Sequence, residues 1–241
     1  MNRTSNWEIL LLQFLLLCPA LLPAQNYRSQ EGISIGGGTS SLGRYKGILS
    51  RSPEGGNSEL QSIAWELGII RIRKTGENMA FSYGMSLTML GHKYRSNQFV
   101  WNPGNPADSV VLTNSRQSIE NYYLGIPLRW SFYLNQNAAG RFFIGPGLLL
   151  AMPIYRNQKI SGTEANGQKK EISDRSFPEK GPYAFICPEL ETGYLVEFPD
   201  CSLARFSLFF SLRSNGILKD ENYYSIQSYT GLRFAWIFGS D

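Results

Sequence analysis

The chain has 241 residues, of which 42% are hydrophobic and 17% charged, and its formal net charge is +4. This composition is too polar for a bundle of membrane helices, which needs apolar runs of roughly 20 residues, and too apolar for a disordered chain. A single histidine and three cysteines leave little material for a metal site, and the modest charge argues against a nucleic-acid partner. We therefore expect neither a cofactor nor bound nucleic acid.

The first predicted element is a targeting segment. A nearly continuous apolar run spans residues 9–17, between a short basic start and a polar stretch. This layout is typical of a secretory signal peptide cleaved after Ala24, so we expect a signal over residues 1–24 and a mature domain over residues 25–241. The alternatives are a retained N-terminal anchor and a lipoprotein signal at Cys18.

The rest of the chain shows a hydrophobic pattern of period two rather than helical spacing. Between Met79 and Met89, large apolar side chains occupy the odd positions and small or polar ones the even positions. Successive side chains of a strand point to opposite faces, so this strand has one apolar and one small, polar face. Eight segments follow the pattern, in chain order 32–41, 63–69, 79–89, 124–132, 142–152, 184–196, 206–212 and 232–238.

Two architectures fit such strands: a soluble lipocalin-like barrel with the apolar face inside, or a membrane barrel with that face outside. Several strands reach the roughly 10 residues that a tilted strand needs to cross a bilayer. Their polar faces carry Gly, Ala and Ser with hardly any Lys, which is typical of a narrow lumen.

The connections between the predicted strands also favour the membrane. Short connections are expected at 74–78, 135–140 and 198–201, and long ones at 42–59, 91–118 and 155–181, with a shorter fourth loop at 219–222. Outer-membrane barrels sort short periplasmic turns and long extracellular loops in this way. The sequence therefore predicts an all-β, eight-stranded antiparallel up-and-down transmembrane barrel in the outer membrane, monomeric and in contact with lipid.

Charged side chains on the polar faces predict a filled lumen, because a charge that faces lipid at mid-depth costs about 2–4 kcal/mol. The expected lumen charge network consists of Glu66, Arg129, Arg141, Glu189, Glu191, Arg205, Arg213 and Arg233. We expect ion pairs among them to close the barrel, with a gate or a polar path for a small solute as the alternative. Arg71 and Arg73 have the opposite parity, which indicates either side chains that reach the lipid headgroups or a bulge.

Aromatic residues on the apolar faces predict a girdle at one membrane interface. Most of them lie toward the short-turn ends of their strands, so we expect a periplasmic girdle. Its members are Phe81, Trp130, Phe132, Phe142, Tyr194, Phe206, Phe234, Trp236 and Phe238.

The hairpin register predicts that the mature chain contains no disulfide. If residues 199–200 form the turn centre, Phe198 pairs with Cys201 and Cys187 lies opposite Leu212. The two cysteines are then far apart along the strand, whereas a disulfide needs Cα atoms within about 7 Å. We therefore expect Cys187 and Cys201 to remain two separate thiols.

Few residues in the sequence suit catalysis, and we expect no catalytic centre. A lipid A hydrolase would need a histidine and a serine that face the outer leaflet, and only His92, with Ser86 or Ser96 near it in sequence, offers such a pair. The glycine run at 36–38 lacks the Gly-Lys-Ser/Thr ending and the helix of a phosphate loop.

The segment Tyr123-Leu-Gly-Ile-Pro-Leu-Arg-Trp130 resembles the Y-L-x-I-P-L strand of Bacteroidetes-type outer-membrane β-barrel proteins, which include PorT-like proteins. Phe143-Ile-Gly-Pro-Gly147 resembles the next strand of that family. The resemblance implies an eight-stranded barrel and, for PorT-like members, an accessory role in type IX protein secretion with other envelope proteins as partners. Independently of it, the residues predict a structural or interaction role through the extracellular loops.

Overall fold

The structure is a computed structural model that describes residues 29–46, 50–51, 58–101, 110–134, 140–176, 185–217 and 223–239. The expected signal peptide lies outside this part of the chain. Among the described residues, no helix has the length and apolar character needed to cross a membrane. The strands are β1 (Ser29–Lys46), β2 (Ser50–Arg51), β3 (Ser58–Leu60), β4 (Ser62–Lys74), β5 (Met79–Trp101), β6 (Val110–Tyr133), β7 (Gly140–Thr163), β8 (Lys169–Ser176), β9 (Phe185–Glu197), β10 (Leu203–Ile217) and β11 (Tyr223–Ile237).

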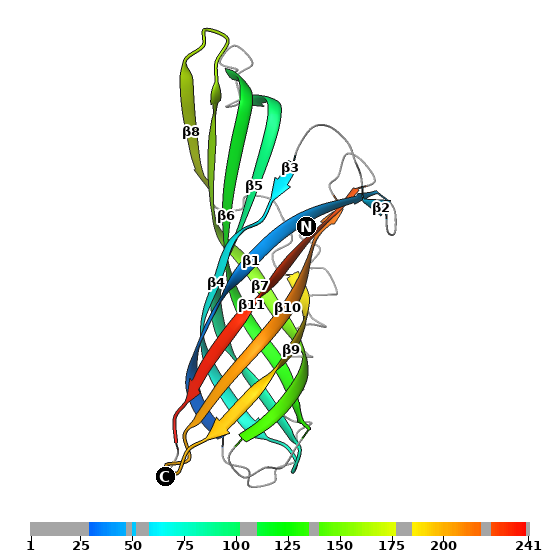
Figure 1. Cartoon of the computed structure of the whole chain (residues 1–241), viewed down its shortest axis with the longest axis vertical. Coiled ribbons are helices and arrows are strands. Elements are labelled where there is room, and N and C mark those ends of the chain that lie inside the picture. Colours follow the sequence, from blue (N-terminus) through cyan, green and yellow to red (C-terminus); the bar gives the residue numbers. More distant parts are fainter. Residues whose placement is uncertain are drawn as a thin grey trace, which may run out of the picture.

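Eight of these strands close into one antiparallel ring. In the order β1, β4, β5, β6, β7, β9, β10 and β11, each strand pairs with the next, and β11 pairs back with β1. Figure 1 shows the ring as a barrel of tilted strands, with the red β11 beside the blue β1. Each of the eight predicted segments overlaps one of these strands, so the predicted eight-stranded barrel is confirmed.

The outer face of the ring carries a belt of apolar side chains. Ile63 is 70% exposed and Leu232 is 69% exposed, whereas a water-soluble barrel would bury such side chains in its core. The belt also contains Ile33, Ile35, Leu67, Ile69, Met85, Leu124, Ile126, Phe132, Phe142, Ile144, Met152, Ile186, Leu190, Phe206, Leu208, Phe210 and Leu212. A closed antiparallel ring with an apolar outer face is the architecture with which strands cross the outer membrane, and it excludes the lipocalin-like alternative.

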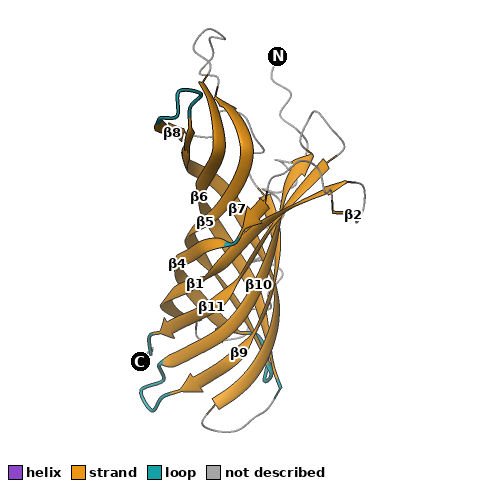
Figure 2. Cartoon of the chain, turned by 45° about the horizontal axis from the view of Figure 1, so that its top comes forward, coloured by secondary structure: helices purple, strands orange, loops and turns teal. Residues whose placement is uncertain are grey.

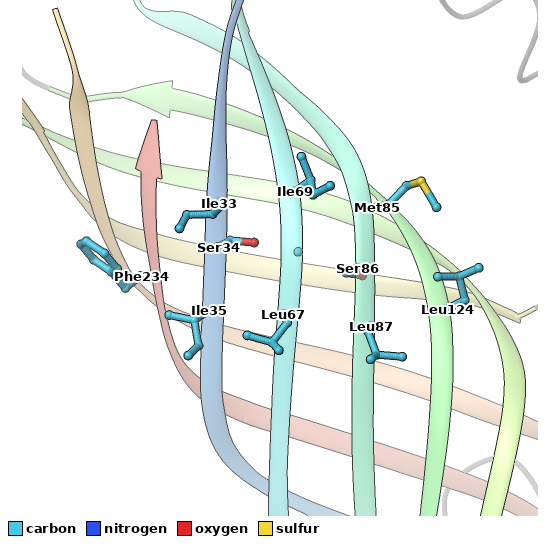
Figure 3. A pocket seen from close by; sticks show the side chains of 11 residues that line it. Ile33, Ser34, Ile35, Leu67, Ile69, Met85, Ser86, Leu87, Leu124 and Phe234 are labelled. Atoms are coloured by element: carbon cyan, nitrogen blue, oxygen red, sulfur yellow. The ribbon is translucent and has the colours of Figure 1, made fainter. Parts of the chain in front are cut away.

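The belt holds a shallow apolar groove on the outer face of β1, β4 and β5, with a volume of about 580 Å³. Figure 3 shows Ile33, Ile35, Leu67 and Ile69 on one side of the sheet, whereas Ser34 turns toward the other. The groove lies on the face that an outer-membrane barrel turns toward lipid, so it is not a candidate site for a water-soluble ligand.

Two glycines allow the ring to close at the junction of β1 and β11. Gly38 pairs directly with Gly231 in this junction. A Cβ at Gly38 would collide with the carbonyl of Thr230, and a Cβ at Gly231 would collide with the carbonyl of Gly37. The close approach of the two backbones at this row therefore requires residues without side chains.

Three neighbouring strands continue far beyond the length that crosses a bilayer. β5 has 23 residues, and β6 and β7 have 24 each, against roughly 10 for a crossing. Their upper parts, joined by β3 on β5 and β8 on β7, rise above the rest of the barrel in Figures 1 and 2. We call residues 93–101, 110–118 and 158–163, together with β3 and β8, the extracellular sheet, because it lies opposite the short turns.

This sheet corrects the expectation of long loops at 91–118 and 155–181. Most of both stretches is strand: β5 and β6 pair up to Trp101 and Val110, and β7 forms a hairpin with β8. The alternation of apolar and polar residues stops near Met89 because strands that have left the lipid no longer need an apolar outer face.

The turn between β9 and β10 also differs from the predicted register. The amide of Phe198 donates to the carbonyl of Ser202 at 2.9 Å, and Cys201 adopts a φ of 62°. One more residue therefore belongs to the turn, and Glu189 pairs with Ser211 instead of residue 210. The prediction of two thiols is confirmed, since no disulfide joins Cys187 and Cys201.

Candidate functional site

The inward side chains fill the barrel in three layers. The layer nearest the short turns is apolar and contains Ile70, Ile72, Ala80, Leu195, Leu203, Ala235 and Ile237. A second, mainly apolar layer lies further toward the extracellular sheet, with the buried polar His92 and Gln227 beyond it, and contains Ala64, Leu90, Tyr123, Leu149, Ala151, Cys187, Phe209 and Tyr229. Between them lies a charged layer formed by Glu66, Arg129, Glu189, Glu191, Arg205 and Arg233.

The charged layer is electrically balanced, with three arginines and three glutamates. None of the six is more than 6% exposed. Arg233 lies at its centre, because its guanidinium is 2.9 Å from Glu66, 3.4 Å from Glu189 and 3.4 Å from Glu191. A buried arginine is stable only with such partners, and this one has three.

The other two arginines complete the network. Arg129 donates from Nε to Glu189 at 2.8 Å and lies 3.3 Å from Glu66. Arg205 lies 3.0 Å from Glu191 and donates from Nη1 to Ser131 Oγ at 2.9 Å. Hydrogen bonds and ion pairs therefore connect five of the eight strands in the ring, namely β4, β6, β9, β10 and β11.

Two glycines leave room for ion pairs that span three strands. Gly36 of β1 pairs with Glu66 on one side and Arg233 on the other, and those two side chains meet across it. Gly147 of β7 occupies the same position between Arg129 and Glu189. A Cβ at Gly147 would lie 3.0 Å from Cγ of Arg129, whereas a Cβ at Gly36 would reach Cβ of Glu66 only at 3.5 Å, so the space is tighter at Gly147.

Inward aromatic rings cover the guanidinium groups. The Cζ atom of Arg205 lies 4.0 Å from the centroid of Phe143, and that of Arg233 lies 4.1 Å from the centroid of Phe209. Cation–π contacts in a desolvated site contribute about 2 kcal/mol or more. Sequence reasoning missed this role, although Phe143 and Phe209 stand on the lumen parity of their strands.

Of the eight residues predicted for the lumen network, the structure brings six together. Arg141 lies nearer the short turns, where its side chain is 28% exposed, 3.8 Å from Glu197 and above the Tyr133 ring. The side chain of Arg213 lies outside the described part of the chain. Arg71 has the parity of the lipid-facing residues, and its side chain points outward and pairs with Glu31. The pairing of β4 with β1 continues in one register through Arg71, so a bulge is not the reason for its parity. The side chain instead reaches the membrane interface.

The predicted aromatic girdle faces outward near the short turns. Phe142, Tyr194, Phe206 and Phe234 occupy one register row across β7, β9, β10 and β11. Their rings pack at centroid distances of 4.7 Å for Phe142 and Tyr194 and 5.0 Å for Phe206 and Phe234. Of the remaining predicted members, Phe81 and Trp130 pack with ring centroids 5.1 Å apart, and Phe132 and Phe238 are exposed. Trp236 packs at 5.3 Å on Phe198, which was not among the predicted members.

A second aromatic group marks the opposite interface, and sequence reasoning missed it. Trp65 packs on Tyr122 with centroids 6.1 Å apart, and Tyr122 packs on Tyr155 at 5.5 Å. We call these three residues the upper girdle. Aromatic girdles lie at both surfaces of outer-membrane barrels, so the upper girdle fixes where the extracellular sheet leaves the membrane.

His92 lies inside the barrel, not facing the outer leaflet. Only 5% of it is exposed, and its ring nitrogens lie 2.9 Å from the amide nitrogens of Asn121 and Gln227. Ser96 donates its hydroxyl to the carbonyl of Gln98 at 2.6 Å, and Ser86 lies roughly 20 Å away along the strand. His92 therefore forms no catalytic pair with Ser86 or Ser96, the two serines that the sequence offered.

No cluster of three potential metal ligands occurs among the described residues. No protein-family model and no curated protein matches the chain.

Solved structures of small barrels resemble the chain at low identity. Neisserial surface protein A is 10% identical, with 86% of this chain and 97% of that one covered, at a TM-score of 0.35. Ail of Yersinia pestis, solved with the heparin analogue sucrose octasulfate, is 11% identical over 86% of this chain and 99% of that one, at 0.31. The outer membrane protein AlkL, solved in lipid bilayers, is 11% identical over 90% of each chain, at 0.34. The ring of paired strands and its apolar belt carry the assignment of fold and membrane.

Proposed function

We propose that this outer-membrane barrel is closed to solutes and acts through its extracellular sheet, in an interaction or structural role. The three-layer filling of the lumen is the observation that carries the proposal. A balanced layer of six buried charges lies between two apolar layers, so a hydrated ion would have to displace paired charges and then cross hydrophobic side chains. The strand length beyond the membrane, by contrast, builds an ordered surface outside the cell.

Conductance in planar bilayers tests the closed lumen. The purified, folded protein is expected to insert without a stable conductance, while a general porin inserted in the same bilayers serves as the positive control. Heat-modifiable gel mobility of the same sample shows that the barrel is folded. A large, stable ohmic conductance from the folded protein would overturn the proposal in favour of a polar path.

An accessory role in type IX secretion is the second candidate, supported by the resemblance of residues 123–130 to a PorT-like strand. The barrel itself also requires this pattern: Leu124 and Ile126 face lipid, and Arg129 joins the charged layer. Deletion of the gene, followed by measurement of secreted proteins, tests the role. Unchanged secretion would remove it.

Lipid A hydrolysis has weaker support, because His92 is enclosed by amides. The His92→Ala variant is expected to leave lipid A unchanged in mass spectra of isolated outer membranes. An altered acylation pattern would restore the enzyme hypothesis.

A further inference from the structure

The outward face of the extracellular sheet gathers positive charge. Pairing places Lys93, Ser118, Lys159 and Ser173 in one row, and Arg95, Arg116, Ser161 and Glu171 in the next. The same face carries six cations against two carboxylates among the described residues: Lys93, Arg95, Arg116, Lys159, Lys169 and Arg175 against Glu120 and Glu171. We call Lys93, Arg95, Arg116 and Lys159 the basic patch.

The described carboxylates do not neutralise the basic patch. Among the described carboxylates, none lies within 4.0 Å of any of its four cations. Arg95 and Arg116 even stand directly opposite each other on adjacent strands, an arrangement that destabilises a sheet because like charges repel. The charged layer of the lumen shows the contrasting case, in which each arginine has a carboxylate partner.

The patch also lines a groove with a volume of about 450 Å³, which is within the range of small-ligand sites. The hydroxyls of Ser118 and Ser161 and the carboxylate of Glu171 share this groove with the cations. Guanidinium, ammonium and hydroxyl groups are donors that match the oxygens of phosphate, sulfate and carboxylate groups. The hydroxyls and the single carboxylate suit the hydroxyl groups of a sugar that carries such anions.

The height of the patch above the membrane identifies the source of the anions. Tyr122 and Tyr155 of the upper girdle are paired, and Ser118 with Lys159 lies four residues further along these strands. At about 3.3 Å per residue the patch begins roughly 13 Å above the girdle along the strand. This level is where the sugars of outer-leaflet glycolipids stand.

We propose that the basic patch binds anionic saccharides, with phosphorylated sugars of the outer-leaflet glycolipid as the source. The inference deepens the proposed function, because it names a ligand class for the extracellular sheet. The two fail separately: conductance tests the lumen, and saccharide binding tests only the patch.

The first experiment measures binding of folded protein to dextran sulfate, with neutral dextran of the same size as the reference. The Arg95→Gln/Arg116→Gln variant is compared with Arg156→Gln/Lys170→Gln, which removes two exposed cations of β7 and β8 from the opposite face. A cation near an anionic surface contributes about 1 kcal/mol, so the patch variant is expected to bind on the order of thirtyfold more weakly. Its matched control is expected to bind like the unmodified chain.

The second experiment identifies the source of the anion. Vesicles that contain phosphorylated lipopolysaccharide are expected to compete with dextran sulfate for the basic patch, so the binding of dextran sulfate falls in their presence. Vesicles that contain dephosphorylated lipopolysaccharide are expected to compete poorly. If dextran sulfate stays bound and neither lipopolysaccharide competes with it, the outer-leaflet glycolipid is not the ligand. The patch would then bind a free anionic glycan, and the assignment of the glycolipid as the source would be overturned.

Three results would overturn the site itself. These are equal binding of neutral dextran, equal losses in the two double variants, and tighter binding of single-stranded DNA than of dextran sulfate at matched charge. Heat-modifiable mobility of each variant confirms that the barrel is folded, so a loss of binding is assigned to the patch.

Discussion

Removal of one carboxylate from the charged layer tests whether its balance holds the barrel together. Glu66→Gln keeps the shape of the side chain but leaves three arginines facing two glutamates. Glu66 is 1% exposed and is the 2.9 Å partner of Arg233 and a 3.3 Å partner of Arg129. Loss of one partner from a buried ion pair costs about 3–5 kcal/mol, because the remaining charge stays buried. We expect a decrease of that size in the free energy of unfolding.

Urea unfolding in lipid vesicles, followed by tryptophan fluorescence and gel mobility, measures this change. Arg141→Gln is the matched control, because Arg141 and Glu197 are partly exposed and 3.8 Å apart; its loss is expected to cost less than about 1 kcal/mol. The double variant Glu66→Gln/Arg233→Gln restores neutrality, so its cost is expected to be smaller than the sum of the single costs by about 1–3 kcal/mol. Equal costs for Glu66→Gln and Arg141→Gln, or additive costs in the double variant, would refute the reasoning.

Three further predictions follow from the described contacts. A maleimide reagent is expected to label the exposed Cys201 in the folded barrel and the buried Cys187 only after unfolding, and labelling of both in the folded state would contradict the packing of the upper layer. Gly147→Ala places a Cβ 3.0 Å from Arg129 Cγ and is expected to destabilise the barrel by about 1–3 kcal/mol. Gly76→Ala is the control, because the nearest atom to its Cβ is 3.9 Å away, and it is expected to be close to neutral. Equal unfolding midpoints for the two variants would argue against crowding at Arg129. The hydroxyl and the amide of Ser202 hold the pKa of Asp200 below its usual range, so the stabilisation from this turn is present above the unfolded pKa and is lost as the pH falls through the folded pKa. Ser202→Ala removes the hydroxyl and keeps the amide, so an NMR titration is expected to show a higher pKa for Asp200 in this variant. An unchanged value would exclude the hydroxyl as a cause.

Period-two alternation was sufficient to predict all eight strands of the ring and the inward direction of the six residues in the charged layer. The reason is physical: within the bilayer each strand must present apolar groups to lipid, so the parity of Glu66 or Arg233 follows from its neighbours. Above the membrane this constraint ends, and β5, β6 and β7 therefore continued unrecognised into the extracellular sheet.

The register of β9 and β10 was within reach of the same reasoning. Paired residues on neighbouring strands share a face. Glu189 on β9 and Arg205 on β10 both face the lumen and both have odd numbers, so odd-numbered residues of β9 must pair with odd-numbered residues of β10. The predicted pairing of Phe198 with Cys201 breaks this rule, whereas the observed pairing of Glu189 with Ser211 satisfies it. The left-handed conformation of Cys201, which supplies the extra turn residue, has no such signal in the sequence.

The contacts within the charged layer could not be predicted from parity. Parity places a side chain in the lumen, but the partners of Arg233 depend on how far each strand is shifted around the ring. The glycines at 36 and 147 are a signal that was available, because a missing side chain between two opposite charges allows them to meet.

The ion pair across Gly36 has a consequence for the order of assembly. Glu66 and Arg233 are separated by 167 positions in the chain and meet only after β11 has paired with β1. Until that step the charged layer lacks this ion pair, although Arg129 with Glu189 and Arg205 with Glu191 already join strands that precede β11. The contact between Glu66 and Arg233 is therefore specific to the closed ring. A barrel halted before β11 docks has two arginines facing three glutamates in its charged layer, and this excess of one negative charge separates unfinished molecules from finished ones.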